Sequence, residues 1–118
     1  ELEARQAGVP AWQLAGLSAP VPLLSTLTLG ADSPERMAAA AHALDPAAPV
    51  KVKLTGDLEP DIARVRAVRA ARPEAWIGVD ANQGYGRPTL EALLPVLEEA
   101  GIALLEQPLR RGDEASLD

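Results

Sequence analysis

The sequence has 118 residues, a formal net charge of −6 and no cysteine. The length fits one small domain, and the acidic charge argues against nucleic acid or an anionic membrane surface as a partner. The lack of cysteine excludes disulfides, thiolate catalysis and zinc–thiolate sites, and no apolar run approaches the roughly 20 residues of a membrane span, so a cytoplasmic protein is expected.

The first predicted element is the end of a helix, ELEARQAG, which stops at Gly8. A proline-containing link follows, and then a strand-like run over 23–29. A second helix is predicted to begin at Asp32-Ser33-Pro34-Glu35, because this run offers a capping residue, a proline tolerated in the first turn and an acid near the positive end of the helix. That helix is expected to stop at Asp45-Pro46.

Strands and helices then alternate. The predicted elements are a strand over 50–54, a helix over 57–73, a strand over 76–82, a helix over 89–100 and a strand over 102–107. This order is typical of parallel βαβ units and predicts an α/β fold. The helix over 57–73 has one apolar face, and its four arginines are expected mostly off that face: Arg64, Arg66, Arg69 and Arg72. Pro95 predicts a bend in the third of these helices or a late start to it.

A polar residue stands near the presumed carboxyl end of each strand: Thr26, Lys53, Asp80 and Glu106. The spacing between them is close to one strand–helix unit each time. In parallel α/β folds the loops and inward side chains converge at the carboxyl ends of the strands, where chemistry gathers. The alternative, that each residue merely ends its strand in solvent, remains open at this point.

Lysine occurs only twice, at Lys51 and Lys53, whereas arginine occurs nine times. Alternation along a strand places both lysines on one face. Lysine can lose its proton in a protein and arginine cannot, and burial beside another cation favours the neutral, basic amine. We therefore interpret this pair as a candidate base. The competing interpretation is a half-exposed strand that displays charge to water.

Asp80 and Glu106 are expected beside the lysines on the next two strands. Their hard carboxylate oxygens suit Mg²⁺, although salt bridges to Lys51 and Lys53 would explain them equally well. Asn82 lies on the same face as Asp80 and could donate to a substrate or orient a metal ligand. A metal beside a lysine base suggests abstraction of a proton α to a carboxylate, with a divalent cation stabilising the enediolate.

Four segments, KVKL, DIARVRAVRAARP, VDANQGY and LLEQP, together resemble the muconate-lactonizing branch of the enolase superfamily. Within that branch the sequence is most similar to dipeptide epimerases such as L-Ala-D/L-Glu epimerase, over essentially its whole length. The resemblance implies a modified (β/α)₇β TIM-type barrel with an α+β capping domain. Residues 1–19 would be the tail of the capping domain and a linker. Residues 20–118 would be the first half of the barrel, with about four strands and three helices.

The resemblance also implies roles for individual residues. Lys53 would exchange the α-proton on one face of the substrate, and Lys51 would hydrogen-bond near the substrate carboxylate and help to keep Lys53 neutral. Asp80 and Glu106 would be two of three Mg²⁺ ligands, with Asn82 beside them.

The same resemblance lets Thr26, on the first barrel strand, contact the substrate. It places the third metal carboxylate and an opposing lysine on later strands that this sequence does not contain. The sequence is therefore interpreted as a fragment that is inactive by itself, within an intact protein that is an isomerase.

Three functions follow as alternatives. The first is an Mg²⁺-dependent epimerase or racemase acting on a dipeptide or N-acyl amino acid. The second is a related reaction of the same branch: N-succinylamino acid racemisation, o-succinylbenzoate synthesis or muconate cycloisomerisation. The third is a half-barrel without catalysis, stable only when a second copy in a homo-oligomer, or another partner, covers its exposed strand edges.

Overall fold

The computed structural model describes residues 1–113 and 115. Its elements in chain order are α1 (Leu2–Ala7), α2 (Ala11–Leu14), β1 (Leu27–Leu29), α3 (Pro34–His42), β2 (Val50–Lys53), α4 (Leu58–Ala71), β3 (Ile77–Asp80), α5 (Arg87–Glu99) and β4 (Leu104–Glu106). The predicted alternation of strands and helices is therefore confirmed. Within the described part of the chain, no helix is both long enough and apolar enough to cross a membrane.

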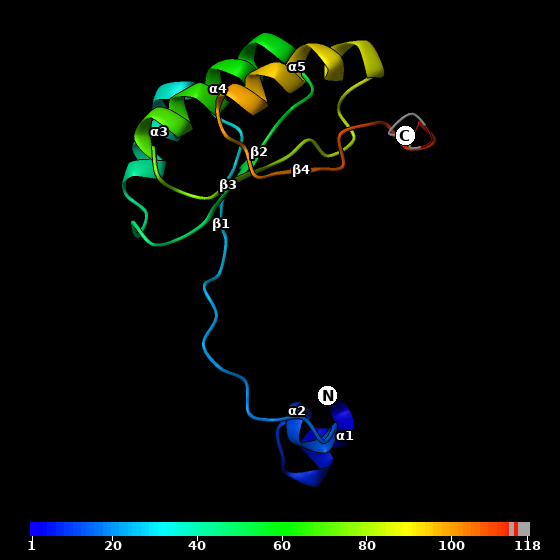
Figure 1. Ribbon diagram of the computed structural model, residues 1–118. Helices are drawn as coiled ribbons and strands as arrows, with labels where there is room; N and C mark the ends of the chain where they lie inside the picture. Colours follow the sequence, from blue (N-terminus) through cyan, green and yellow to red (C-terminus); the bar gives the residue numbers. More distant parts are fainter. Residues whose placement is uncertain (114, 116–118) are drawn as a thin grey trace.

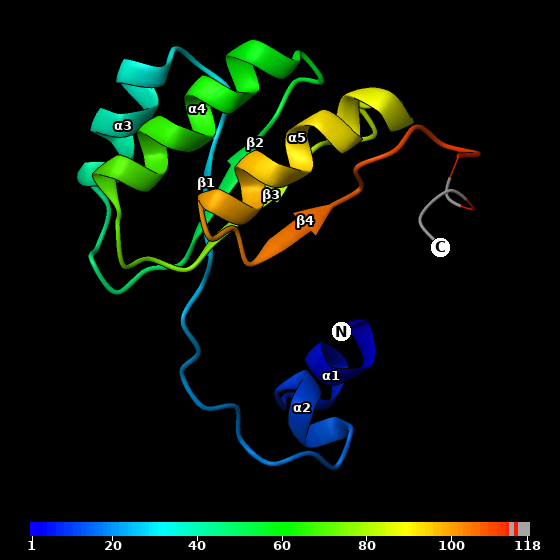
Figure 2. The ribbon, with the colours of Figure 1, turned by 45° about the horizontal axis from the view of Figure 1, so that its top comes forward.

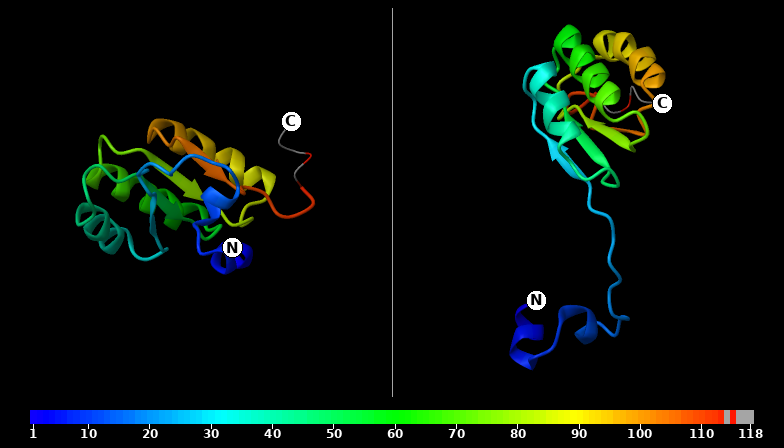
Figure 3. Two further views of the ribbon diagram at one scale, coloured as in Figure 1. Left: turned by 90° about the horizontal axis from the view of Figure 1, so that it is seen from below. Right: turned by 90° about the vertical axis from the view of Figure 1, so that its left-hand side faces the viewer.

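The four strands form one sheet in the order β1-β2-β3-β4, and every neighbouring pair is parallel. All three long helices, α3, α4 and α5, lie on the same face of this sheet (Figures 1 and 2). The right-hand panel of Figure 3 also shows the three helices together on one side of the strands. Four parallel strands covered in this way confirm the predicted α/β class, and their arrangement is that expected of part of a TIM-type barrel.

Strand alternation divides apolar and charged side chains between the two faces. In β2, Val50 and Val52 are completely buried against the helices, whereas Lys51 and Lys53 are only half-buried on the other face. The core lies between sheet and helices and is built almost entirely of aliphatic residues, among them Val52, Val65, Val68, Val79 and Leu93. Burial of this apolar face stabilises the layer by roughly 25 cal/mol for each Å² removed from water.

Helix ends follow local sequence signals. The side chain of Ser33 accepts a hydrogen bond from the Arg36 amide at 3.4 Å, and Pro34 occupies the first turn of α3. Gly8 ends α1 in the left-handed conformation, with φ 68°. α5 begins at Arg87 and continues through Pro95, so the late start considered for this helix is wrong.

α1 and α2 form a small unit of their own, which an extended segment connects to β1 (Figure 1). The expected boundary between residues 19 and 20 falls inside this segment, where neither helix nor strand is present. Its assignment to a capping domain stays a prediction.

The first strand corrects one sequence-based expectation. β1 comprises only Leu27–Leu29, and Thr26 is an exposed residue that precedes it. The register pairs Thr28 with Lys51, so Thr26 lies at the amino end of the sheet and not at the carboxyl end. The assumption of equal spacing put residue 26 at the wrong end of its strand, because the first strand–helix unit is shorter than the next. Leu27 pairs with Val50, 23 residues further on, whereas Val50 pairs with Ile77, 27 residues further on.

The arginines of α4 give a second correction. Arg72 was expected mostly off the buried face, but it is only 7% exposed, and its guanidinium donates four hydrogen bonds to carbonyl oxygens. These carbonyls belong to Ala41, Asp45, Pro46 and Ala48, at the end of α3 and in the loop that leads to β2. Arg72 therefore ties α4 to that loop.

Candidate active site

The open face of the sheet gathers four of the charged residues singled out in the sequence. Lys53 pairs in register with Asp80, and Asp80 with Glu106, so three neighbouring strands bring these side chains into one row. Lys51 stands two residues before Lys53 and projects from the same face. The predicted juxtaposition of Lys51, Lys53, Asp80 and Glu106 is thus present in the structure.

Each charged group in this row touches at least one of the others. Lys51 Nζ lies 2.5 Å from Glu106 Oε2 and 3.4 Å from Asp80 Oδ2, while Lys53 Nζ lies 2.6 Å from the same Asp80 oxygen. The side chain of Asp80 is only 3% exposed, against 41% for Glu106. The ion pairs considered from the sequence are therefore present. One aspartate oxygen, Asp80 Oδ2, contacts both lysine side chains.

Asn82 joins the row from the loop after β3. Its Oδ1 accepts a hydrogen bond from Lys53 Nζ at 3.2 Å, and its backbone amide donates to Asp80 Oδ1 at 3.0 Å. Asn82 and the next residue, Gln83, both have positive φ values, 47° and 64°. Such backbone is uncommon for residues other than glycine and often occurs at functional sites. It turns the chain back so that residue 82 faces the lysines.

The local charges shift two pKa values in opposite directions. Burial alone would raise the pKa of Asp80, but hydrogen bonds from Lys53, from the Asn82 amide and from Lys51 outweigh it and hold this pKa below its ordinary value. The hydrogen bond to Glu106 raises the pKa of Lys51, against the opposing effect of desolvation and with further help from Asp80. A carboxylate and an ammonium ion are therefore the stable forms of these groups near neutral pH.

Asp80 and Glu106 offer a partial binding site for a divalent cation. Because one cationic atom, Lys51 Nζ, contacts both carboxylates, their oxygens converge on a point where positive charge is stabilised. Hard oxygen donors suit Mg²⁺, which normally takes about six ligands and keeps several waters. Among residues 1–113 and 115, no group of three or more carboxylate, histidine or cysteine side chains gathers to hold a metal. This pair alone would thus supply only part of the coordination shell.

Sequence reasoning missed a second charged cluster, on the helix side of the same strand ends. Asp61 is fully buried, pairs with Arg64 at 2.7 Å and accepts a hydrogen bond from the hydroxyl of Tyr85 at 2.5 Å. Helical periodicity contained the signal, because residue 61 lies three positions after Leu58 and four before Val65 on the apolar stripe of α4. A lone acid on a buried stripe requires partners.

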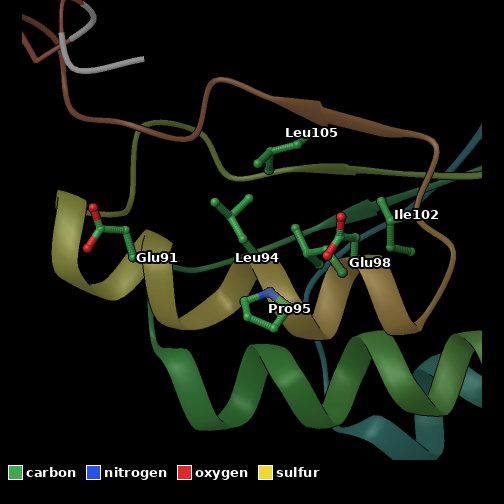
Figure 4. A pocket seen from close by; sticks show the side chains of 7 residues that line it. Glu91, Leu94, Pro95, Glu98, Ile102 and Leu105 are labelled. Carbon is green, nitrogen blue, oxygen red and sulfur yellow. The ribbon is translucent and has the colours of Figure 1, made fainter. Parts of the chain in front are cut away.

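A hollow of about 440 Å³ lies away from the lysines, between α5 and β4 (Figure 4). Leu94, Pro95, Ile102 and Leu105 give it apolar walls, with Glu91 and Glu98 also among its lining residues. Alternation along β4 puts Leu105 on the helix side of the sheet, opposite to Glu106. The hollow therefore does not adjoin the lysine–carboxylate row.

The fold and the row of charges define an α/β chain of the TIM-barrel type with lysines and carboxylates on its inner face. Residues 35–118 match the family model described as enolase C-terminal domain-like. The chain belongs to this family.

Relatives of the chain include epimerases, a racemase and chloromuconate cycloisomerases. It is 34% identical over 120 residues to L-Ala-D/L-Glu epimerase of Escherichia coli (strain K12), an alignment that covers 100% of this chain and 37% of that protein. It is 32% identical over 117 residues to N-acetyl-D-glutamate racemase of Pseudoalteromonas sp, covering 99% of this chain and 36% of the relative.

A solved structure agrees with these relationships. The crystal structure of a dipeptide epimerase from Cytophaga hutchinsonii, complexed with Mg and the dipeptide D-Ala-L-Val, superimposes with a TM-score of 0.86 at 31% identity. That comparison covers 98% of this chain and 32% of the other. The chain thus spans about a third of the length of the relatives it matches.

Proposed function

We propose that the full-length protein containing this chain is an Mg²⁺-dependent epimerase that moves the proton α to a carboxylate in a dipeptide or N-acyl amino acid. The observation that carries the proposal is the row on the open face, where a lysine amine lies 2.6 Å from a buried carboxylate beside a second lysine–carboxylate pair. In this proposal the protein is cytoplasmic, and residues 1–19 are the tail of a capping domain and a linker.

Lys53 would hold and move the proton. Its side chain stands at the carboxyl end of β2 and is 34% exposed on the open face, so a substrate laid against that face can reach it. Lys51 carries the stabilised positive charge, because the hydrogen bond to Glu106 raises its pKa. Lys53 is the side chain next to it on the open face, in the position of a base that meets the substrate.

Asp80 and Glu106 would hold the metal, and Asn82 would fix the orientation of the Asp80 carboxylate through its backbone amide. When bound, Mg²⁺ supplies positive charge that stabilises the enediolate left after proton removal. The inward row of Lys51, Lys53 and Asp80 would exclude water beneath the substrate and position its carboxylate. Inversion also needs a proton donor on the opposite side of the substrate.

The substrate class is proposed from the relatives. Two relatives act, by their names, on L-Ala-D/L-Glu and on N-acetyl-D-glutamate, which share an acylated α-nitrogen and a free carboxylate. An acylated nitrogen and an ionised carboxylate fit the proposed site, since the carboxylate can approach Lys51 and the metal. The other reactions of the branch share the same proton abstraction.

The test measures α-proton exchange of L-Ala-L-Glu, N-acetyl-L-glutamate and N-succinyl-L-amino acids in D₂O with Mg²⁺, by proton NMR. The full-length wild-type protein is expected to incorporate deuterium at the α-carbon. The Lys53→Arg variant should lose about 10²–10⁴-fold in rate, because it keeps the charge but cannot lose a proton.

A matched control is Arg66→Lys, a swap of the same two side chains at an exposed position of α4. It should exchange at the wild-type rate. Wild-type exchange by Lys53→Arg would remove Lys53 from the mechanism. If the wild-type protein exchanged none of these substrates, the interpretation as a structural half-barrel would gain support.

A further inference from the structure

The loop that follows Lys53 is held from behind by one buried carboxylate. Asp61 Oδ2 accepts hydrogen bonds from the backbone amides of Thr55 and Gly56, both at 2.9 Å, and Asp61 Oδ1 accepts from the Thr55 hydroxyl at 3.2 Å. Thr55 stands two residues after Lys53. The carboxylate of Asp61 therefore fixes the backbone at the point where the chain leaves the catalytic strand.

Tyr85 connects the same carboxylate to two more loops. Its hydroxyl donates to Asp61 Oδ2 at 2.5 Å, and its ring is fully buried. The backbone amide of Tyr85 donates to Pro108, and its carbonyl accepts from the Arg110 amide, both at 3.2 Å. Since Tyr85 lies in the loop after β3, and Pro108 and Arg110 follow β4, its hydroxyl and its backbone together link both loops to Asp61.

Arg64 extends the connection to the loop after β1. Its guanidinium donates from Nη1 to Asp61 Oδ1 at 2.7 Å and to Thr55 Oγ1 at 2.9 Å, and from Nε to the carbonyl of Asp32 at 2.9 Å. Asp32 lies between β1 and α3. The side chains of Asp61, Arg64 and Tyr85 thus join the loops after β1, β2 and β3, and the backbone of Tyr85 adds the loop after β4.

A close backbone contact joins two of these loops without any side chain. Gly56 has φ 90°, and a Cβ placed on it would lie 2.6 Å from the carbonyl oxygen of Gly84. The loops after β2 and β3 therefore cannot shift independently. Lys53 and Asp80, which precede them on neighbouring strands, meet at 2.6 Å, a separation that a small relative displacement would disturb.

We propose that Asp61, with Arg64 and Tyr85, is a positioning cluster that holds the loops after β1, β2, β3 and β4 in one arrangement and thereby sets the placement of Lys53 against Asp80. The cluster does not touch the lysine–carboxylate row; it acts through the backbone of Thr55, Gly56 and the loop that carries Tyr85. The inference rests on the proposed function where kcat is measured. The amide hydrogen-exchange measurement does not depend on that function.

The test uses the full-length protein and three variants. Asp61→Asn keeps the shape of the side chain but puts an NH₂ group where one carboxylate oxygen accepts hydrogen bonds from backbone amides or from the Arg64 guanidinium. Tyr85→Phe removes a single hydrogen bond and keeps the ring. Glu59→Gln is the matched control, since Glu59 is an exposed acid in the same first turn of α4.

Two quantities are measured at a temperature where every variant is folded: the amide hydrogen-exchange rates of Thr55 and Gly56, and kcat and KM for α-proton exchange per folded molecule. Asp61→Asn should speed exchange of both amides and lower kcat, each by about tenfold, with KM within about twofold. Tyr85→Phe should lower kcat by about threefold. Glu59→Gln should match the wild type in both quantities.

A role confined to stability would lower the melting temperature of Asp61→Asn and Tyr85→Phe but leave kcat per folded molecule unchanged, and that result would overturn the proposal. If Asp61→Asn did not fold, Tyr85→Phe alone would decide. If the wild-type protein had no α-proton exchange activity, the proposed function would fail, but the amide hydrogen-exchange rates of Thr55 and Gly56 would still test the positioning cluster. Faster amide exchange in the variants would support the cluster. Amide exchange as slow as in the wild type would overturn it.

Discussion

The two faces of the sheet use charge in opposite ways. On the helix side, Asp61 and Arg72 are buried, and their partners are backbone groups or side chains fixed by packing. On the open face, Lys51 divides its contacts between two carboxylates, and Asp80 divides its contacts between two lysines. The buried contacts on the helix side hold the structure together. On the open face, a lysine or carboxylate that shares its partners can give up one contact to bind a proton, a metal ion or a substrate.

This contrast predicts how substitutions should sort. A change on the open face should alter chemistry more than the free energy of unfolding, and a change deep on the helix side should do the reverse. The loops at the strand ends connect both faces, so changes there should affect both quantities. Four predictions test this division.

The largest effect is expected on the open face, from Asp80→Asn. Removing the charge should weaken Mg²⁺ binding by at least about a hundredfold, because even residues that merely support metal ligands cost about 10–100-fold when lost. The measurement is a titration of α-proton exchange with Mg²⁺, together with calorimetric binding of the metal. Asp57→Asn is the control, since Asp57 is an exposed acid at the N-cap position of α4 whose side chain makes no capping hydrogen bond, and asparagine is equally favoured there. An unchanged Mg²⁺ titration would show that Asp80 is not a metal ligand and serves only as an ion-pair partner of the two lysines.

On the helix side, Arg72→Met should lower the free energy of unfolding by about 2 kcal/mol, because four carbonyl oxygens lose a charged donor and some of them are buried. The kcat of the folded protein should stay close to the wild-type value. Urea unfolding and activity per folded molecule check both parts. Arg66→Met, at an exposed position of the same helix, should change stability by no more than about 0.5 kcal/mol. Equal losses in the two variants would show that the carbonyl contacts of Arg72 contribute nothing.

The open face was predictable from sequence and the helix side was not. A period of two along β2 and near-equal spacing between β2, β3 and β4 were enough to place Lys53, Asp80 and Glu106 together. These rules describe regular strands, and the row occupies regular strands. The same spacing failed for Thr26, because the unit after β1 is shorter than the others and no local signal marks its register.

The partners of Asp61 and Arg72 come from loops, and loop conformation is what sequence periodicity does not contain. The sequence placed Arg72 on the surface, at the end of an amphipathic helix. In the structure its guanidinium donates hydrogen bonds to carbonyl groups at and just after the end of α3. Tyr85 was visible only as part of VDANQGY, and its hydroxyl meets Asp61 because the loop after β3 folds over Gly56. Such contacts depend on tertiary packing that no single segment encodes.

At the junction of the two faces, Gly56→Ala should disturb both stability and chemistry. The backbone of Gly56 has φ 90°, and an added methyl group would collide with the carbonyl oxygen of Gly84. We expect a loss of about 1.5 kcal/mol in unfolding free energy and a lower kcat. Gly30→Ala is the control, because nothing lies within 4 Å of a Cβ at that position and its φ is not positive. A lower free energy of unfolding with an unchanged kcat would show that the loop after β2 does not influence the lysine–carboxylate row.

The smallest effect is a pH dependence that belongs to the helix side. Burial, and then the hydrogen bond to the Asp61 carboxylate, raise the pKa of Tyr85 above its ordinary value, which is about 10 in an unfolded chain. Above about pH 10 the unfolded chain releases this proton and the folded protein keeps it. The contribution of Tyr85 to stability is therefore fully present below about pH 10 and declines as the pH rises further.

Tyr85→Phe isolates this contribution because both proteins share every other titrating group. Urea unfolding at intervals between about pH 7 and pH 11 should show the wild type more stable by about 1 kcal/mol up to about pH 9, with the difference shrinking above about pH 10. Tyrosinate absorbance in the folded wild type, with the variant subtracted, should stay absent over this range. A stability difference that held constant to about pH 11 would mean that Tyr85 ionises as readily in the folded protein as in water, which its burial beside Asp61 does not allow.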